Sequence, residues 1–134
     1  MAISTEAIRE LRERTGAGIM DVKRALEAAD GNQQQAEAAL REKGLTKAAA
    51  KSGRNTAEGV VDSYIHGGGR IGALVELNCE TDFVARTPEF VELAHNLAMQ
   101  VAAMGAVYVA REDMPADDTR DPEEVCLLDQ AFIK

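Results

Sequence analysis

The sequence predicts an α+β protein with helices in residues 1–44 and a β-hairpin packed on a long helix in residues 57–134. Three observations predict this class. Apolar residues recur at helical spacing in the first segment, alternate with period two around a triple glycine, and return to helical spacing after Pro88. Residues 45–56 begin as good helix formers and end in breakers, so they are the predicted linker between two domains.

Charge supports this division and limits the possible functions. The net charge of the 134 residues is −8, but residues 1–56 carry 10 basic and 8 acidic side chains, whereas residues 57–134 carry 5 and 15. Such asymmetry indicates two units with different surfaces. The acidic balance argues against a general nucleic-acid binder, because phosphate contacts favour Lys and Arg.

Cysteine, histidine and hydropathy patterns predict no cofactor and no metal. Two cysteines, Cys79 and Cys126, are too few for a disulfide framework or a metal site, and Cys79 is expected to be buried in a strand. Neither His66 nor His95 has a second ligand at metal-site spacing. No signal peptide or membrane-spanning run is recognisable, so we expect a reduced, cytoplasmic setting without membrane contact.

Three short helices are predicted in residues 1–44. The first ends at the glycine-rich segment 15–18, the second spans about 19–29, and the third spans about 33–43, with Gly44 just beyond its end. The expected inward positions are Ile8, Leu11, Ile19, Val22, Leu26, Ala29, Ala36, Ala39 and Leu40.

This arrangement resembles a small bundle of the ubiquitin-associated type, which is only marginally stable alone. Ile19 and Met20 lie in the first turn of its second helix. They either complete the core or form a contact surface, and the sequence leaves both alternatives open.

Residues 57–80 are the predicted hairpin, because two alternating apolar runs flank Gly67-Gly68-Gly69. The glycines are expected to form its turn. They do not form a phosphate-binding loop, because the Gly-x-x-x-x-Gly-Lys-Ser/Thr spacing is absent.

The hairpin ends in residues 78–86, Asn-Cys-Glu-Thr-Asp-Phe-Val-Ala-Arg, just before a helical pattern begins. Thr81 and Asp82 can each cap a helix through a side-chain oxygen. Phe83 is therefore placed at a strand-to-helix junction. It either packs into the core, as most aromatic side chains do, or is offered to a partner as an interface anchor.

Residues 88–104 form the clearest predicted helix. Its apolar stripe is expected to cover the hairpin, and it consists of Phe90, Leu93, Ala94, Leu97, Val101 and Met104. Residues 107–109 are predicted to be a short strand or an extended segment. Residues 111–124 contain seven acidic residues and are predicted to be an exposed loop, followed by a second ordered piece.

Two stretches resemble the elongation factor Ts family of bacterial and organellar translation. Residues 76–85, Glu-Leu-Asn-Cys-Glu-Thr-Asp-Phe-Val-Ala, resemble the family signature, and residues 11–26 resemble its amino-terminal motif. The two stretches occur in the family's order and at its spacing. The resemblance covers roughly residues 3–110.

The resemblance implies a guanine-nucleotide exchange factor for the GTPase elongation factor Tu, not an enzyme. It implies that Asp82 and Phe83 enter between helices of the partner near its Mg²⁺ and phosphate site, framed by Thr81 and Val84. The bundle positions matched to partner contacts are Leu11, Ile19 and Met20, with Ile19 where methionine is common in the family.

The chain departs from the family near its carboxyl end. The family has a helical segment between the acidic loop and the stretch that resembles Leu127–Lys134, and further strands after it. The resemblance therefore implies that residues 57–134 are an incomplete core of the dimerisation type. The chain either recovers the missing sheet as a homodimer or is a fragment or reduced variant.

Two other readings compete. One is an interaction module with a ubiquitin-associated-like bundle and no exchange activity. The other is a small enzyme that uses Cys79, His66 and Asp82, which share no recognised motif spacing.

Overall fold

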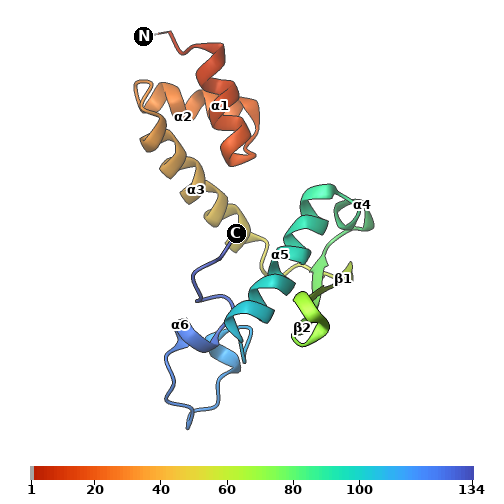
Figure 1. Cartoon of the computed structure of the whole chain (residues 1–134). Helices are drawn as coiled ribbons and strands as arrows, with labels where there is room; N and C mark the ends of the chain where they lie inside the picture. The colour runs from red at the N-terminus through yellow and green to blue at the C-terminus, as the bar shows by residue number, and fades with distance from the viewer. Residues whose placement is uncertain (1) are drawn as a thin grey trace. The chain divides into compact units, whose positions relative to one another are not determined.

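The computed structural model describes residues 2–134 as two compact units, one ending at Arg54 and one spanning Asn55–Lys134 (Figure 1). The first unit is helical, and the second combines a two-stranded antiparallel sheet with a long helix. This confirms the predicted α+β class.

The first unit consists of α1 (Thr5–Thr15), α2 (Ile19–Ala28) and α3 (Gln33–Ala50). The Ser4 side chain caps α1 by accepting a hydrogen bond from the Ala7 N–H, and Gly16 ends the helix with φ 65°, a conformation that favours glycine. The three helices bury one small core, which consists of Leu11, Val22, Leu26, Ala36 and Leu40.

The predicted end of the third helix at Lys43 is wrong, because α3 continues to Ala50. A helical glycine costs only about 1 kcal/mol relative to alanine, so Gly44 is a weak stop when Leu, Lys and three Ala follow it. The linker prediction is corrected accordingly, since residues 45–50 are helical. Ala39, predicted to point inward, is exposed because α3 buries the stripe of Ala36 and Leu40.

We expect limited digestion with the broad-specificity protease proteinase K to cut first within residues 51–57 or 111–124. Residues 51–57 are exposed and lie outside the helix that precedes them, and exposed loops are nicked preferentially. Mass spectrometry of the first fragments checks this. Early cleavage inside residues 88–104 would contradict the layout.

The second unit is built on the hairpin of β1 (Glu58–Ile65) and β2 (Gly72–Cys79). Its register pairs Ile65 with Gly72 near the turn and Glu58 with Cys79 at the open end. The triple glycine forms a 3₁₀ turn, η1 (Gly67–Gly69), as the hairpin prediction requires.

α5 (Pro88–Met104) packs on one face of this hairpin. Ala94 and Ala98 are fully buried at its centre. Leu93 and Met104, which were predicted to cover the hairpin, are 43% and 45% exposed. A sheet of two strands is too narrow to cover a whole helical stripe, so positions at its margins remain in solvent.

Gln100 of α5 is fully buried and holds the end of the chain. Its side-chain N–H group donates to Gln130 Oε1 at 3.2 Å and to the Ala131 carbonyl at 3.1 Å, and its oxygen accepts from the Ile133 N–H at 2.9 Å. These bonds satisfy a buried amide that would otherwise be costly. The predicted ordered piece at the end of the chain is therefore confirmed.

The acidic segment between these elements is more ordered than predicted. It contains η2 (Arg111–Asp113), and its end belongs to α6 (Pro122–Val125). Asp118 accepts hydrogen bonds from Tyr108 and Arg120, and the Arg120 guanidinium holds the pKa of Asp118 well below its usual range. Tyr108 forms a single parallel bridge with Cys126, so the predicted short strand is one bridge.

Candidate functional site

The junction after β2 is a four-residue helix, α4 (Asp82–Ala85), capped by Thr81. Thr81 Oγ1 accepts a hydrogen bond from the Val84 N–H at 3.3 Å. The cap predicted at residues 81–82 therefore belongs to a separate short helix. The long helix α5 has its own cap, because Thr87 Oγ1 accepts from the Phe90 N–H.

Two buried side chains hold α4 and the end of β2 in place, and this junction is called the corner. Ala85 is 6% exposed, and Cys79 is 8% exposed at the end of β2, as predicted for a small buried residue. The Cys79 thiol donates to the carbonyl oxygen of Thr81, with Sγ and O 3.1 Å apart. The strand is thus linked to the cap residue by a contact that the sequence pattern did not indicate.

Phe83, unlike Ala85 and Cys79, is exposed to solvent. It is 80% exposed, the highest value for a large apolar side chain among residues 2–134. Burial would have been the ordinary outcome for an aromatic ring, so the interpretation of Phe83 as a core residue is wrong. The corner therefore presents a bare ring to solvent.

The neighbours of Phe83 are also accessible. Asp82 forms an ion pair with Arg86, one helical turn further along the chain, with Oδ2 and Nη2 3.2 Å apart. The two side chains are 48% and 78% exposed. Val84 is 44% exposed, and Thr81 is exposed. All four predicted site residues are therefore exposed at least in part.

The three bundle positions differ in their environment. Ile19 and Met20 are 58% and 55% exposed at the start of α2, which settles their position as surface. Leu11 is fully buried in the bundle core. Its side chain offers no surface for a direct contact, and it supports the helices that carry the other two.

Asp21 connects this edge to α3. Lys43 Nζ donates to its carboxylate at 2.6 Å, and Lys47 Nζ lies 3.5 Å away. The hydrogen bond and charge of Lys43, with the charge of Lys47, lower the pKa of Asp21. The start of α2 is therefore tied to α3 at Lys43, where the helix was predicted to end, and at Lys47, in the part that the sequence had not predicted to be helical.

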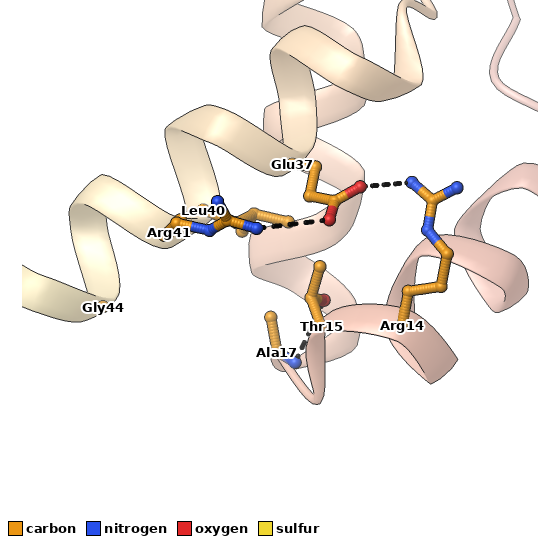
Figure 2. A pocket seen from close by; sticks show the side chains of 7 residues that line it. All are labelled: Arg14, Thr15, Ala17, Glu37, Leu40, Arg41 and Gly44. Atoms are coloured by element: carbon orange, nitrogen blue, oxygen red, sulfur yellow. Dashed lines mark hydrogen bonds and ion pairs between the residues drawn. The ribbon is translucent and has the colours of Figure 1, made fainter. Parts of the chain in front are cut away.

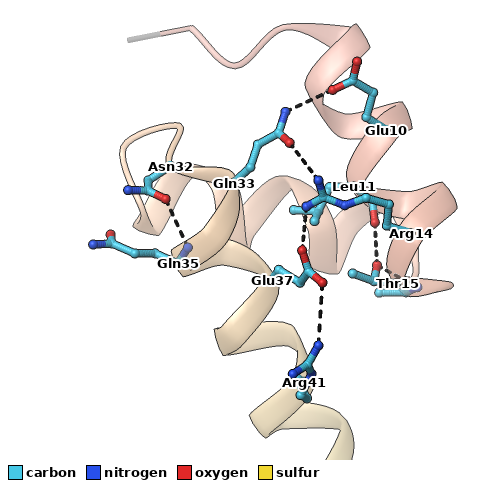
Figure 3. A network of polar contacts seen from close by, with 10 residues as sticks. Glu10, Leu11, Arg14, Thr15, Asn32, Gln33, Gln35, Glu37 and Arg41 are labelled. Atoms are coloured by element: carbon cyan, nitrogen blue, oxygen red, sulfur yellow. Dashed lines mark hydrogen bonds and ion pairs between the residues drawn. The ribbon is translucent and has the colours of Figure 1, made fainter. Parts of the chain in front are cut away.

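The bundle also contains a pocket of about 290 Å³ between the end of α1 and the middle of α3 (Figure 2). It is lined by Arg14, Thr15, Ala17, Glu37, Leu40, Arg41 and Gly44. Glu37 pairs with Arg14 at 2.6 Å and with Arg41 at 3.7 Å, and Figure 3 shows how Gln33 extends this network to Glu10. The charges compensate one another, so the network serves to tie α3 to α1.

The grouping of Cys79, His66 and Asp82 as an enzyme site is wrong. Cys79 lies at the open end of the hairpin and His66 follows Ile65 at its turn. Seven residue steps along a strand separate the two ends by roughly 20 Å. His66 Nδ1 instead lies 3.0 Å from Tyr64 Oη, and His95 Nδ1 lies 3.5 Å from Asp62 Oδ2.

Among residues 2–134, no three His, Cys, Asp or Glu side chains gather as a metal site would require. None of the helices formed by these residues is both long and apolar enough to span a bilayer.

Thr87 is the residue near the corner that sequence reasoning missed. A threonine directly before a proline signals a helix cap followed by the first helical residue, so the pattern was available. Its hydroxyl contacts both α4 and α5.

Comparisons with known proteins agree with the sequence motifs. A family model described as elongation factor TS matches residues 9–122. A protein named elongation factor Ts from Carboxydothermus hydrogenoformans is 57% identical, with 98% of this chain and 75% of the relative covered. Relatives of the same name from Thermotoga sp. (strain RQ2) and Syntrophomonas wolfei are 56% and 49% identical, covering 93% and 98% of this chain.

The relatives are longer than this chain. It covers 63% of the Thermotoga protein and 76% of the Syntrophomonas protein. The Carboxydothermus alignment spans 162 positions, whereas the chain has 134 residues, so at least 28 residues of the relative, the difference between these numbers, have no counterpart here. This agrees with the missing segment expected from the motifs. The matches over nearly the whole chain show that it belongs to the elongation factor Ts family of translation elongation factors.

Proposed function

We propose that this chain binds the GTPase elongation factor Tu in its GDP form and accelerates GDP release, so that GTP can rebind during elongation in the cytoplasm. The observation that carries the proposal is Phe83, an aromatic ring 80% exposed on a capped and anchored corner. Asp82 and Phe83 together are called the tip. Thr81 and Val84 flank it in the sequence.

The proposed action needs no bond to be made or broken. GTPases hold GDP through phosphate-loop amides, a lysine and Mg²⁺. A factor that binds the nucleotide-free GTPase more tightly than the GDP form must weaken GDP binding by the same coupling factor. A ring inserted near the Mg²⁺ site would disturb the metal's surroundings and supply this coupling.

The corner suits this task because it is organised before binding. Ala85 and Cys79 are buried beneath it, and Thr81 caps the helix that carries the ring. A side chain that is already held in place loses less entropy when it enters a partner. Exposed aromatic side chains of this kind are typical interface anchors.

The bundle provides the second proposed contact. Ile19 and Met20 form an exposed apolar edge at the start of α2, and Leu11 supports this edge from the core. In this proposal α1–α3 bind the partner GTPase, residues 51–57 connect the units, and the hairpin with α4 and α5 carries the tip.

Met20→Asp should weaken binding of elongation factor Tu while leaving the helical circular dichroism signal intact. The side chain is 55% exposed, so a carboxylate there stays hydrated in the free chain but is desolvated in an apolar interface. Titration calorimetry and far-UV circular dichroism on the same sample check the two effects. Loss of the helical signal would assign Met20 to the core and contradict the proposed edge.

The assay for the function itself is release of a fluorescent GDP analogue from elongation factor Tu. Adding the chain should raise the release rate in a concentration-dependent manner that saturates. Phe83→Ala serves as the matched control, because it removes only the exposed ring. An unchanged release rate at a chain concentration that saturates binding would contradict exchange activity.

A second candidate is an interaction module that binds the partner without exchange. It is favoured by the absence here of at least 28 residues present in the Carboxydothermus relative, the difference between 162 aligned positions and 134 residues. Binding without accelerated release would support it.

Homodimer formation is a separate proposal, to be tested by light scattering of the purified chain.

A further inference from the structure

Phe83 stands on a helix that cannot hold itself in place. α4 has four residues, and isolated helices shorter than about 12 residues are marginal in water. The ring is 80% exposed and so adds almost no packing of its own. The direction in which it points must therefore be set by the buried Ala85, by the Thr81 cap and by bonds to the elements that flank α4.

Thr87 provides two such bonds through one oxygen atom. Its hydroxyl donates to the carbonyl oxygen of Val84 at 2.8 Å and accepts from the N–H of Phe90 at 3.3 Å. Val84 directly follows Phe83, and Phe90 lies in the first turn of α5. A single side chain thus joins the helix that carries the ring to the next helix.

The two helices are not equally fixed. α5 has 17 residues and packs on the hairpin, with Ala94 and Ala98 fully buried. The residue before a proline is restricted to extended conformations, and Pro88 accordingly follows a Thr87 with φ −68° and ψ 142°. The Thr87 hydroxyl therefore fixes the position of α4 relative to α5, which is held by its packing on the hairpin.

We propose that Thr87 is a positioning residue that sets the direction of Phe83 by bonding α4 to α5. This inference rests on the proposed function, in which Phe83 is the group offered to the GTPase. Loss of the hydroxyl lets α4 reorient, which lowers the maximal rate of stimulated release. The concentration for half-maximal effect changes little, because the bundle supplies a separate contact.

The first test needs no partner. The chain contains no tryptophan, so Phe83→Trp introduces a single tryptophan at the exposed tip, which is excited selectively at wavelengths where Tyr64 and Tyr108 do not absorb. In this background Thr87→Val, which keeps the shape but removes the hydroxyl, should increase the amplitude of nanosecond anisotropy decay. Thr87→Ser keeps the hydroxyl and should restore the original decay, and Thr119→Val is the control at an exposed threonine far along the chain.

The second test uses GDP release with Phe83 intact. Thr87→Val should lower the maximal stimulated rate about fivefold, the equivalent of one hydrogen bond of about 1 kcal/mol. Thr87→Ser should stay within about twofold of the original rate, since it retains the same two bonds. Melting temperatures measured on the same samples report the separate loss of the α5 cap.

Equal anisotropy decays for Thr87→Val and the parent would overturn the proposal. So would a Thr87→Val chain that keeps the full maximal rate, or a Thr87→Ser chain that loses as much as the valine variant. If the unmodified chain fails to accelerate release at all, the proposed function fails, while the anisotropy comparison still decides whether Thr87 holds the tip.

Discussion

Phe83→Ala is expected to slow stimulated GDP release from elongation factor Tu at least about tenfold, equivalent to about 1.4 kcal/mol. The ring is 80% exposed, so its removal takes little packing from the free chain. Thr81 still caps α4 through the Val84 N–H, because neither group belongs to the deleted ring. The loss should therefore appear in function and not in folding.

Thermal unfolding of the same samples separates the two roles. The melting temperature should fall by no more than a few degrees, as expected for truncation of an exposed side chain. Asp82→Ala should share part of the functional loss and also removes the ion pair with Arg86. Full exchange activity together with a large drop in melting temperature would show that Phe83 is a structural residue.

Leu11→Ala is expected to have the largest effect on stability. Leu11 is fully buried in the core of the bundle, and truncating a buried leucine to alanine costs about 2–5 kcal/mol. A three-helix unit of this size has little stability to lose. The bundle should therefore unfold in part, and binding to the GTPase should weaken although Leu11 offers no surface.

Ile19→Ala is the matched control for this prediction. It truncates an apolar side chain that is 58% exposed, so it should change the free energy of unfolding by less than about 0.5 kcal/mol. Chemical denaturation followed by circular dichroism measures both variants. A Leu11→Ala chain as stable as the parent, but impaired in binding, would make Leu11 a direct contact.

The elements with strong periodicity were predictable from the sequence. Alternation on both sides of Gly67–Gly69 predicts β1 and β2, and helical spacing after Pro88 predicts α5, because each pattern reports the face that is buried. The end of α3 was not predictable from Gly44. The helix formers that follow Gly44, together with the ion pairs of Asp21 with Lys43 and Lys47, can offset the free-energy cost of a single helical glycine.

The candidate site was predictable in position but not in exposure. Thr81 signals a cap, yet a helix as short as α4 leaves no periodic pattern that would say which way Phe83 points. Leu11 shows the same ambiguity. Its helical spacing predicted a buried core position, whereas the family motif matched it to a partner contact. Only the packed structure separates a buried position from an exposed neighbour.

The dependence of GDP release on free Mg²⁺ tests the central claim most directly. If the chain acts by disturbing the Mg²⁺ and phosphate site of elongation factor Tu, removing the metal should by itself accelerate GDP release and so reproduce part of the effect of the chain. The account predicts a large stimulation of release by the saturating chain at millimolar Mg²⁺ and a clearly smaller stimulation once the metal is chelated. A stimulation factor that is the same with and without Mg²⁺, or no stimulation at any Mg²⁺ concentration, would contradict it.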